Sequence, residues 1–95
     1  MLYVIATLTA RPDTIDATRD ALASLVEPTR AEAGCLGYAL TQSVDDPAVF
    51  RTVEQWETQQ AAEAHMTTPH VGAALAAAGS LLGAPPDIRS FAVIA

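Results

Sequence analysis

Residues 2–10, LYVIATLTA, decide the fold of this chain. The stretch is apolar and rich in β-branched residues on both of its alternating faces, which carry Leu2, Val4, Ala6 and Leu8 on one side and Tyr3, Ile5 and Thr7 on the other. This pattern is typical of a strand that is covered on both sides. We therefore expect a first strand here, in a sheet that leaves neither face in water.

A helix is predicted after this strand, opened by Pro12 and Asp13 and ended before Gly34. Its apolar residues form one helical stripe, made of Ile15, Leu22, Leu25, Val26 and Thr29. Pro28 lies inside the segment and has no backbone donor, so we expect it to kink or divide the helix.

Two more strands are predicted at residues 35–43 and 49–57, joined by the turn Val44-Asp45-Asp46-Pro47-Ala48. The second of them places alternate residues on one face, namely Phe50, Thr52, Glu54 and Trp56. Thr58 is expected to cap a short helix that runs to residue 66. Thr68 and Pro69 begin another helix, which ends at Gly83 and has a stripe made of Val71, Leu75, Ala78 and Leu82. Residues 87–94 predict the last strand.

The order of these elements, β-α-β-β-α-β with the second helical region broken in two, predicts a ferredoxin-like α+β fold. We expect one domain over residues 1–95, with a four-stranded antiparallel sheet and all helices on one face. The strands are apolar on both faces, so the second face needs a cover. A symmetric partner sheet that closes a barrel around a cavity is the simplest candidate, which predicts a homodimer.

Composition excludes several classes of function. The chain has 95 residues, with 11 acidic against 5 basic ones and a net charge of −6, so nucleic acid is a poor candidate partner. It has no lysine, which excludes Schiff-base chemistry. Cys35 is the only cysteine, so an intrachain disulfide or a cysteine-based metal cluster cannot form, and a reducing cytoplasm fits best. We expect neither a signal peptide nor a membrane-spanning segment.

Glu54 and His65 are the candidate catalytic residues. Glu54 shares a strand face with Trp56 and Phe50, so its carboxylate needs a donor from a helix end, a backbone amide or an arginine, or else it serves a pocket. For His65, a packing role and acid–base work both stay open. His70 is a further pocket candidate, against a capping or solvated role. Because Pro69 separates the two histidines, which are not at the i, i+4 spacing of a helical metal pair, no metal site is expected.

Several segments together resemble the antibiotic biosynthesis monooxygenase (ABM) family of dimeric α+β barrels. They are residues 30–38 (RAEAGCLGY), Asp45-Asp46-Pro47 leading to Phe50, Glu54-x-Trp56, Ala64-His65 and Thr68-Pro69-His70. The resemblance implies oxygenation of an electron-rich quinol, phenol or anthrone in an apolar barrel cavity, with molecular oxygen as co-substrate and no metal or flavin. In that interpretation Glu54 and His65 are catalytic, and Trp56, Tyr38, Phe50 and His70 contact the substrate.

Two other functions stay open on the same fold. One is a non-catalytic dimer that binds a small hydrophobic metabolite or serves as a stress-linked accessory protein, and the other is an isomerase on a small carbonyl compound. The haem-degrading branch of this barrel is disfavoured. It uses a strand-one asparagine, a tryptophan where His65 stands and a haem-ligating histidine where Leu75 stands, and this chain has no asparagine at all.

Overall fold

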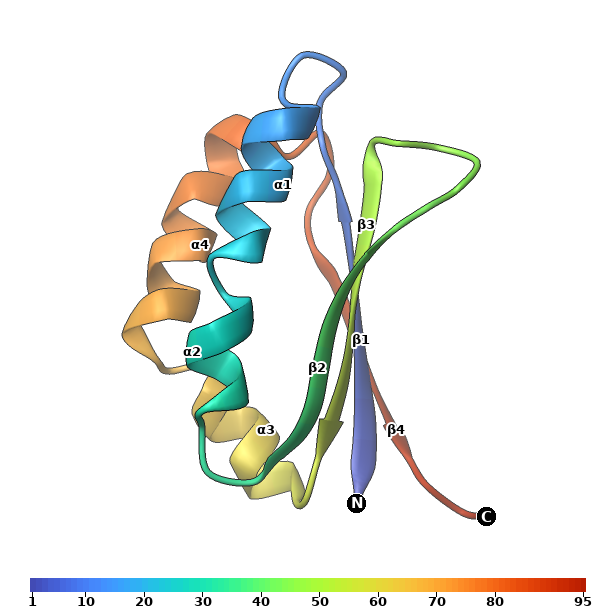
Figure 1. The fold of residues 1–95 in the computed structure, drawn as a ribbon, viewed down its shortest axis with the longest axis vertical. Coiled ribbons are helices and arrows are strands. Elements are labelled where there is room, and N and C mark those ends of the chain that lie inside the picture. The colour runs from blue at the N-terminus through green and yellow to red at the C-terminus, as the bar shows by residue number, and fades with distance from the viewer.

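The computed structural model describes residues 1–95 as one sheet with helices on one face (Figure 1). The strands are β1 (Leu2–Thr9), β2 (Cys35–Gln42), β3 (Val49–Trp56) and β4 (Asp87–Ala92). The helices are α1 (Ile15–Ala23), α2 (Val26–Arg30), α3 (Gln59–His65) and α4 (Pro69–Leu81). All strand pairs are antiparallel, in the order β2-β3-β1-β4. The predicted ferredoxin-like α+β fold is confirmed.

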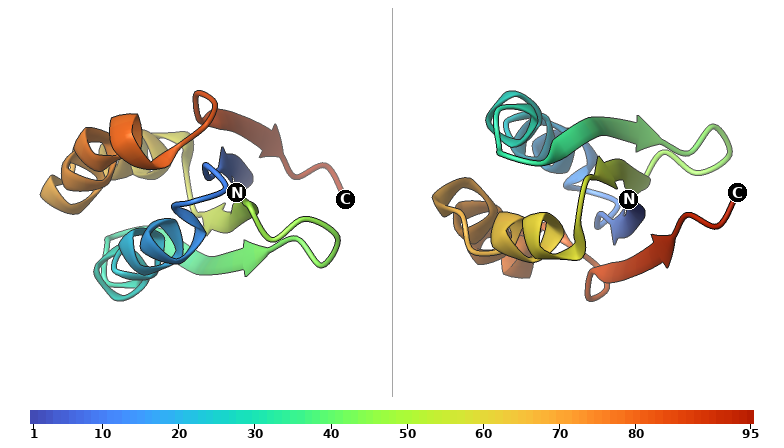
Figure 2. Two further views of the ribbon diagram at one scale, coloured as in Figure 1. Left: turned by 90° about the horizontal axis from the view of Figure 1, so that it is seen from above. Right: turned by 90° about the horizontal axis from the view of Figure 1, so that it is seen from below.

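The helices divide the covered face of the sheet between them. Seen along the sheet, α1 and α2 lie over the β2 half, while α3 and α4 lie toward the β4 half (Figure 2). The other face carries no helix in any view. No helix is both long and apolar enough to cross a bilayer.

The first helical region is divided as predicted, but the break lies before Pro28. Helix α1 ends at Ala23, and Pro28 sits within α2. Proline cannot donate to the carbonyl four residues back, here that of Ser24, and its ring crowds that carbonyl. The chain therefore tightens just there, where the Leu25 amide bonds the Leu22 carbonyl in an i to i−3 contact.

Two further expectations need correction. Strand β4 ends at Ala92, two residues before the predicted end, because only residues 87–92 pair with β1. The apolar stripe predicted along residues 71–82 is only partly buried: Val71 in α4 and Leu82 just after it are covered, whereas Leu75 remains half-exposed. Leu75 borders a cavity instead of packing into the core.

The core forms two clusters at opposite ends of β3. Phe50 packs with Ala10, Leu22 and Leu25, and Trp56 packs with Leu2 and Val4. The buried residues of β3 are Phe50, Thr52, Glu54 and Trp56, as strand periodicity predicts. Thr52 and Glu54 thus form a polar interval between two apolar clusters.

Candidate functional site

Glu54 is buried in the polar interval of β3, and its own strand satisfies it. Thr52 Oγ1 donates to Glu54 Oε2 at 2.8 Å, and Trp56 Nε1 donates to Oε1 at 2.9 Å. Side chains two residues apart on a strand share a face, which brings both donors to one carboxylate. The expected donors, a helix end, a backbone amide or an arginine, are not the ones used.

His65 lies at the end of α3 with its ring against the same face of the sheet. Its ring centroid is 5.0 Å from that of Trp56 and 5.9 Å from that of Tyr38. Nε2 lies 3.9 Å from Glu54 Oε1, which is too long for a hydrogen bond. Nδ1 lies 2.7 Å from Glu32 Oε2. The imidazole thus lies between two acids, of which Glu54 is buried and Glu32 is partly exposed.

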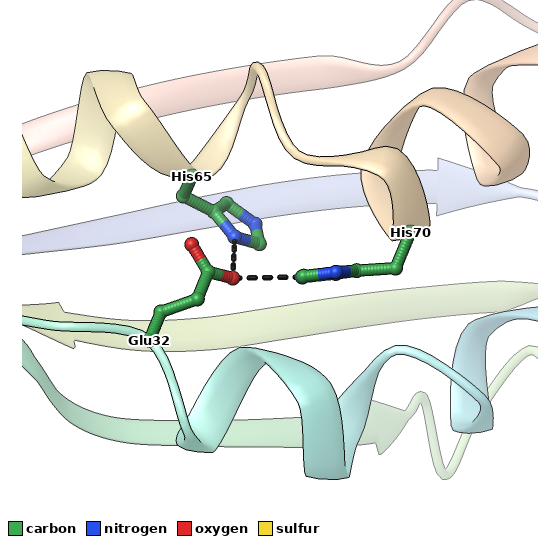
Figure 3. A group of neighbouring side chains, drawn as sticks. All are labelled: Glu32, His65 and His70. Atoms are coloured by element: carbon green, nitrogen blue, oxygen red, sulfur yellow. Dashed lines mark hydrogen bonds and ion pairs between the residues drawn. The ribbon is translucent and has the colours of Figure 1, made fainter.

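Glu32 joins the two histidines (Figure 3). The Oε2 atom that pairs with His65 also lies 2.8 Å from His70 Nε2. The three side chains come from the connection between α2 and β2, the end of α3 and the first turn of α4. Their candidate ligand atoms all lie within 4.8 Å of one another, so Glu32, His65 and His70 could hold a metal ion.

Local sequence explains how these segments meet. Gly34 has φ of +80°, and a Cβ at this position would lie 2.6 Å from Ala61 Cβ, so only glycine lets the turn after Glu32 approach α3 this closely. At the next turn, the Thr68 side chain caps α4 through the Val71 amide. Its hydroxyl also donates to the His65 carbonyl at 2.8 Å. These contacts fix both histidines relative to each other.

An apolar cavity of about 80 Å³ lies beside Glu54 and His65, between the helices and the sheet of a single chain. Most of its wall is hydrophobic side chains of α1, α4 and β1; its polar lining is Thr18, Tyr38, Thr52, Glu54 and His65. A second hollow of about 180 Å³ reaches Glu54 and His65 from the side of α3 and β4. The first of these cavities lies on the helix-covered face, because α4 is too poor in large side chains to fill the space above β3.

Burial also sets the chemistry of two neighbouring groups. Burial and the nearby Glu54 carboxylate raise the pKa of the Tyr38 phenol well above its ordinary value, so this residue is a neutral wall of the cavity. Burial likewise raises the pKa of the Cys35 thiol. Cys35 is therefore a small apolar residue here and not a nucleophile.

The sequence profile of the family described as antibiotic biosynthesis monooxygenase matches residues 1–77. The chain belongs to this family. The Mycobacterium tuberculosis protein named "Putative monooxygenase Rv0793" is 37% identical, over 94% of this chain and 87% of that protein. Escherichia coli YgiN, named "Probable quinol monooxygenase", is 35% identical, over 77% of this chain and 80% of its own.

Solved structures agree with this membership. The crystal structure of PA3566 from Pseudomonas aeruginosa superposes with a TM-score of 0.92 at 38% identity, covering 99% of this chain and 94% of that one. The structure of Rv0793 superposes with a TM-score of 0.93 at 33% identity, covering 99% and 95%. The ABM fold therefore extends over almost the whole chain.

The ABM resemblance named six candidate site residues, and the structure separates them. Glu54, His65 and Tyr38 border the cavity. Trp56 and Phe50 are fully buried in the two core clusters and lie behind it. His70 pairs with Glu32, so it is neither a cavity wall nor a helix cap.

Sequence reasoning missed two residues of this candidate site. Glu32 lies inside the stretch that carried the family resemblance, but its pairing with both histidines depends on packing between distant segments. Thr18 is buried, borders the cavity and has no hydrogen-bond partner for Oγ1. The sequence did offer one indication of Thr18, because it lies on the same helical stripe as apolar residues of α1. A threonine hydroxyl on a buried stripe needs a hydrogen-bond partner.

Proposed function

We propose that this protein is a cofactor-independent monooxygenase that oxygenates an electron-rich aromatic molecule such as a quinol, a phenol or an anthrone. The observation that carries the proposal is His65, which borders an apolar cavity with one ring nitrogen held by Glu32. Membership of the ABM family and similarity to a protein named as a quinol monooxygenase agree with this reaction class.

The first step of the proposed reaction is removal of a proton from the substrate. Ground-state dioxygen is a triplet and reacts slowly with closed-shell molecules, so the substrate must first become an electron-rich anion. Glu32 accepts a hydrogen bond from His65 Nδ1, which leaves the lone pair of the neutral ring on Nε2. In this proposal Nε2 takes the substrate proton, and the apolar cavity keeps water away from the anion.

The anion then gives one electron to dioxygen, and the two radicals combine into a C–O bond. The proton on His65 Nε2 passes to the distal oxygen, which gives a hydroperoxide. For an anthrone, loss of water from this hydroperoxide forms a carbonyl group. One oxygen atom stays in the product, the other leaves as water, and the substrate supplies all the electrons.

Glu54 is assigned a positioning role in this proposal. Both of its oxygens already accept hydrogen bonds, from Thr52 and Trp56, so it is poorly placed to take a proton from the substrate. Its Oε1 atom lies 3.9 Å from His65 Nε2. A carboxylate at that distance stabilises the imidazolium that forms when Nε2 is protonated.

The proposal includes a homodimer. The sheet face opposite the helices exposes apolar side chains of β1, β3 and β4, among them Tyr3, Val53 and Phe91. An extended apolar sheet face is typical of a protein interface. A second copy of this chain is the partner whose face has the same chemistry.

Oxygen uptake with a panel of quinols and anthrones tests the reaction. We expect uptake with at least one compound, and a loss of rate of about 10²–10⁴ in His65→Ala and in Glu54→Gln. Glu57→Gln, an exposed acid removed in the same way, should keep the wild-type rate. Isomerised product without oxygen uptake would favour an isomerase, and tight ligand binding without turnover would favour a binding protein.

Stability of the same variants separates a chemical role from a structural one. If Glu54 were only structural, Glu54→Gln would lower the melting temperature by several degrees because a buried charge-assisted hydrogen bond is weakened, while the rate per folded protein would stay near wild type. Full activity in a folded His65→Ala, Glu54→Gln double variant would remove both residues from the mechanism.

A further inference from the structure

We infer that Glu32, His65 and His70 form a binding site for a divalent transition-metal ion of the zinc class. Two imidazoles and one carboxylate are the donor set of many three-ligand zinc sites, which complete their coordination with water. Imidazole nitrogen also favours zinc over magnesium or calcium, which prefer oxygen ligands. Nothing in the proposed oxygenation requires this ion, so the inference stands apart from that function.

The spacing of the three donor atoms suits one ion. Glu32 Oε2 lies 2.7 Å from His65 Nδ1 and 2.8 Å from His70 Nε2, and all three atoms fall within 4.8 Å of one another. Ligand atoms around a tetrahedral zinc ion are about 3.3 Å apart, so the carboxylate must retreat by about half an ångström, and the two imidazole nitrogens, which lie within 4.8 Å of each other, must settle near that spacing. The three side chains converge from separate segments (Figure 3), so small side-chain rotations of Glu32 and of both histidines would bring their donor atoms around one ion.

The cluster is shielded but open to solvent on one side. Side-chain exposure rises from 6% at His65 to 14% at Glu32 and 22% at His70. A hydrated ion can therefore reach the cluster past His70, and a water molecule can fill the fourth position. The chain has no lysine, so no lysine ammonium group competes with a metal ion for the Glu32 carboxylate, and the net charge of −6 favours the approach of a cation.

Glu54 lies on the Nε2 side of the His65 ring, where its negative charge favours a metal-bound imidazole without a direct hydrogen bond. Metal-bound histidines commonly donate their other ring N–H to a carboxylate, which fixes the ring and strengthens the ligand. With a metal on Nδ1, the proton of neutral His65 moves to Nε2, which faces Glu54 Oε1 at 3.9 Å. In this arrangement Nε2 already carries a proton and cannot accept one from the substrate. Bound zinc is therefore expected to inhibit the proposed action of His65 as a general base.

Zinc binding is best measured by isothermal titration calorimetry on tag-free protein that has been stripped with a chelator and dialysed. The chain has only two histidines and one cysteine, so few other zinc ligands exist. We expect one ion per chain and a melting temperature that rises with zinc concentration. Glu32→Gln and His70→Ala should each raise Kd by more than about 100-fold, and Glu54→Gln by about 10-fold.

Two variants serve as controls. Glu57→Gln removes an exposed acid outside the cluster, and Cys35→Ser removes the only thiol, so both should bind zinc like wild type. Circular dichroism checks folding, and His70→Gln replaces His70→Ala if the latter is unfolded. The inference is overturned if wild type binds no zinc below millimolar concentration, or if Glu32→Gln and the His70 variant bind it as tightly as wild type.

Discussion

Thr18 is a buried residue whose hydroxyl has no partner, and it faces the cavity. A buried unpaired hydroxyl costs about 1–3 kcal/mol, a cost that is recovered if a ligand supplies the missing hydrogen bond. Thr29 has the same defect but does not border the cavity. The two threonines therefore form a natural pair for separating a ligand contact from a packing defect.

We predict that Thr18→Val and Thr29→Val both leave the free energy of unfolding unchanged or raise it by about 1 kcal/mol, since each removes an unpaired group with little change in shape. Only Thr18→Val should weaken binding of an oxygenated aromatic ligand or raise KM. Chemical denaturation and ligand titration measure the two effects. Equal ligand affinity in both variants would mean that Thr18 does not contact the ligand.

Tyr38 gives the protein a specific dependence on alkaline pH. Its phenol keeps its proton in the folded state because its pKa is raised by burial and by Glu54, whereas in the unfolded chain it ionises near pH 10. Above that pH the unfolded state binds fewer protons than the folded state, so stability falls as pH rises, by at most about 1.4 kcal/mol per pH unit. Well below pH 10 the phenol is protonated in both states, so this residue does not make the free energy of unfolding depend on pH.

Tyr38→Phe should remove that part of the alkaline loss. Urea unfolding at several pH values between 9 and 11 measures it, and the remaining tyrosine, Tyr3, is half-exposed in both proteins. An identical alkaline slope in wild type and Tyr38→Phe would contradict the assigned environment of this phenol.

At the scale of elements, the site depends on how closely the α2–β2 connection approaches α3. Gly34 has a positive φ, and an added Cβ would lie 2.6 Å from Ala61 Cβ. Gly34→Ala should therefore lower the free energy of unfolding by at least about 2 kcal/mol and move Glu32 away from the histidines. Gly37 is the matched control, because a Cβ there would make an ordinary 3.9 Å contact with Gln55. Gly37→Ala should stay within about 0.5 kcal/mol of wild type.

Histidine NMR signals report whether the cluster follows the backbone. In wild type and Gly37→Ala we expect a slowly exchanging Nδ1 proton on His65, bonded to Glu32. Loss of that signal in Gly34→Ala, with the signal kept in Gly37→Ala, would support the conclusion that the turn at Gly34 positions Glu32 against His65. An unchanged signal in a destabilised Gly34→Ala would show that Glu32 reaches His65 without this turn.

The elements themselves follow closely from local sequence. Period two along β3 assigns the buried face that carries Phe50 and Trp56, and Thr58 and Thr68 both cap helices through their side chains. Contacts between elements are a different matter. His65 ends α3 and His70 begins α4, so the i, i+4 spacing rule for metal ligands on one helix does not apply to them. Whether both histidines reach one carboxylate depends on the turn between the two helices and on the segment that carries Glu32. Glu32 could be found only by knowing how the α2–β2 connection packs.

At the scale of the whole molecule, the helices cover one face of the sheet and leave the other bare (Figure 1). Alternating apolar residues in β1 predict that both faces are covered, and this chain covers only one of them. The cavity on the helix side follows from the shape of α4, whose small side chains leave space above β3. Residue patterns state which faces are apolar, but they do not state where a void remains.

The bare face predicts self-association. Tyr3, Val53 and Phe91 are 39%, 38% and 50% exposed in the single chain. A symmetric interface of standard size buries about 800 Å² on each partner, and burial of its apolar part favours association against the loss of translational and rotational freedom. Light scattering should therefore give a mass near twice the 9.9 kDa of one chain at micromolar concentration.

A charge in the centre of that face should separate the partners. Val53 lies opposite Ile5 on β1 and Ala39 on β2, and between Arg51 and Gln55 on its own strand. Val53→Glu places a carboxylate at the centre of this face and should shift the protein toward monomer and lower its melting temperature. Val44→Glu makes the same change at a site that is 98% exposed and lies outside the sheet, so it should leave the mass unchanged. A folded wild-type monomer, or a Val53→Glu protein that associates as strongly as Val44→Glu, would mean that the apolar face is not the dimer interface.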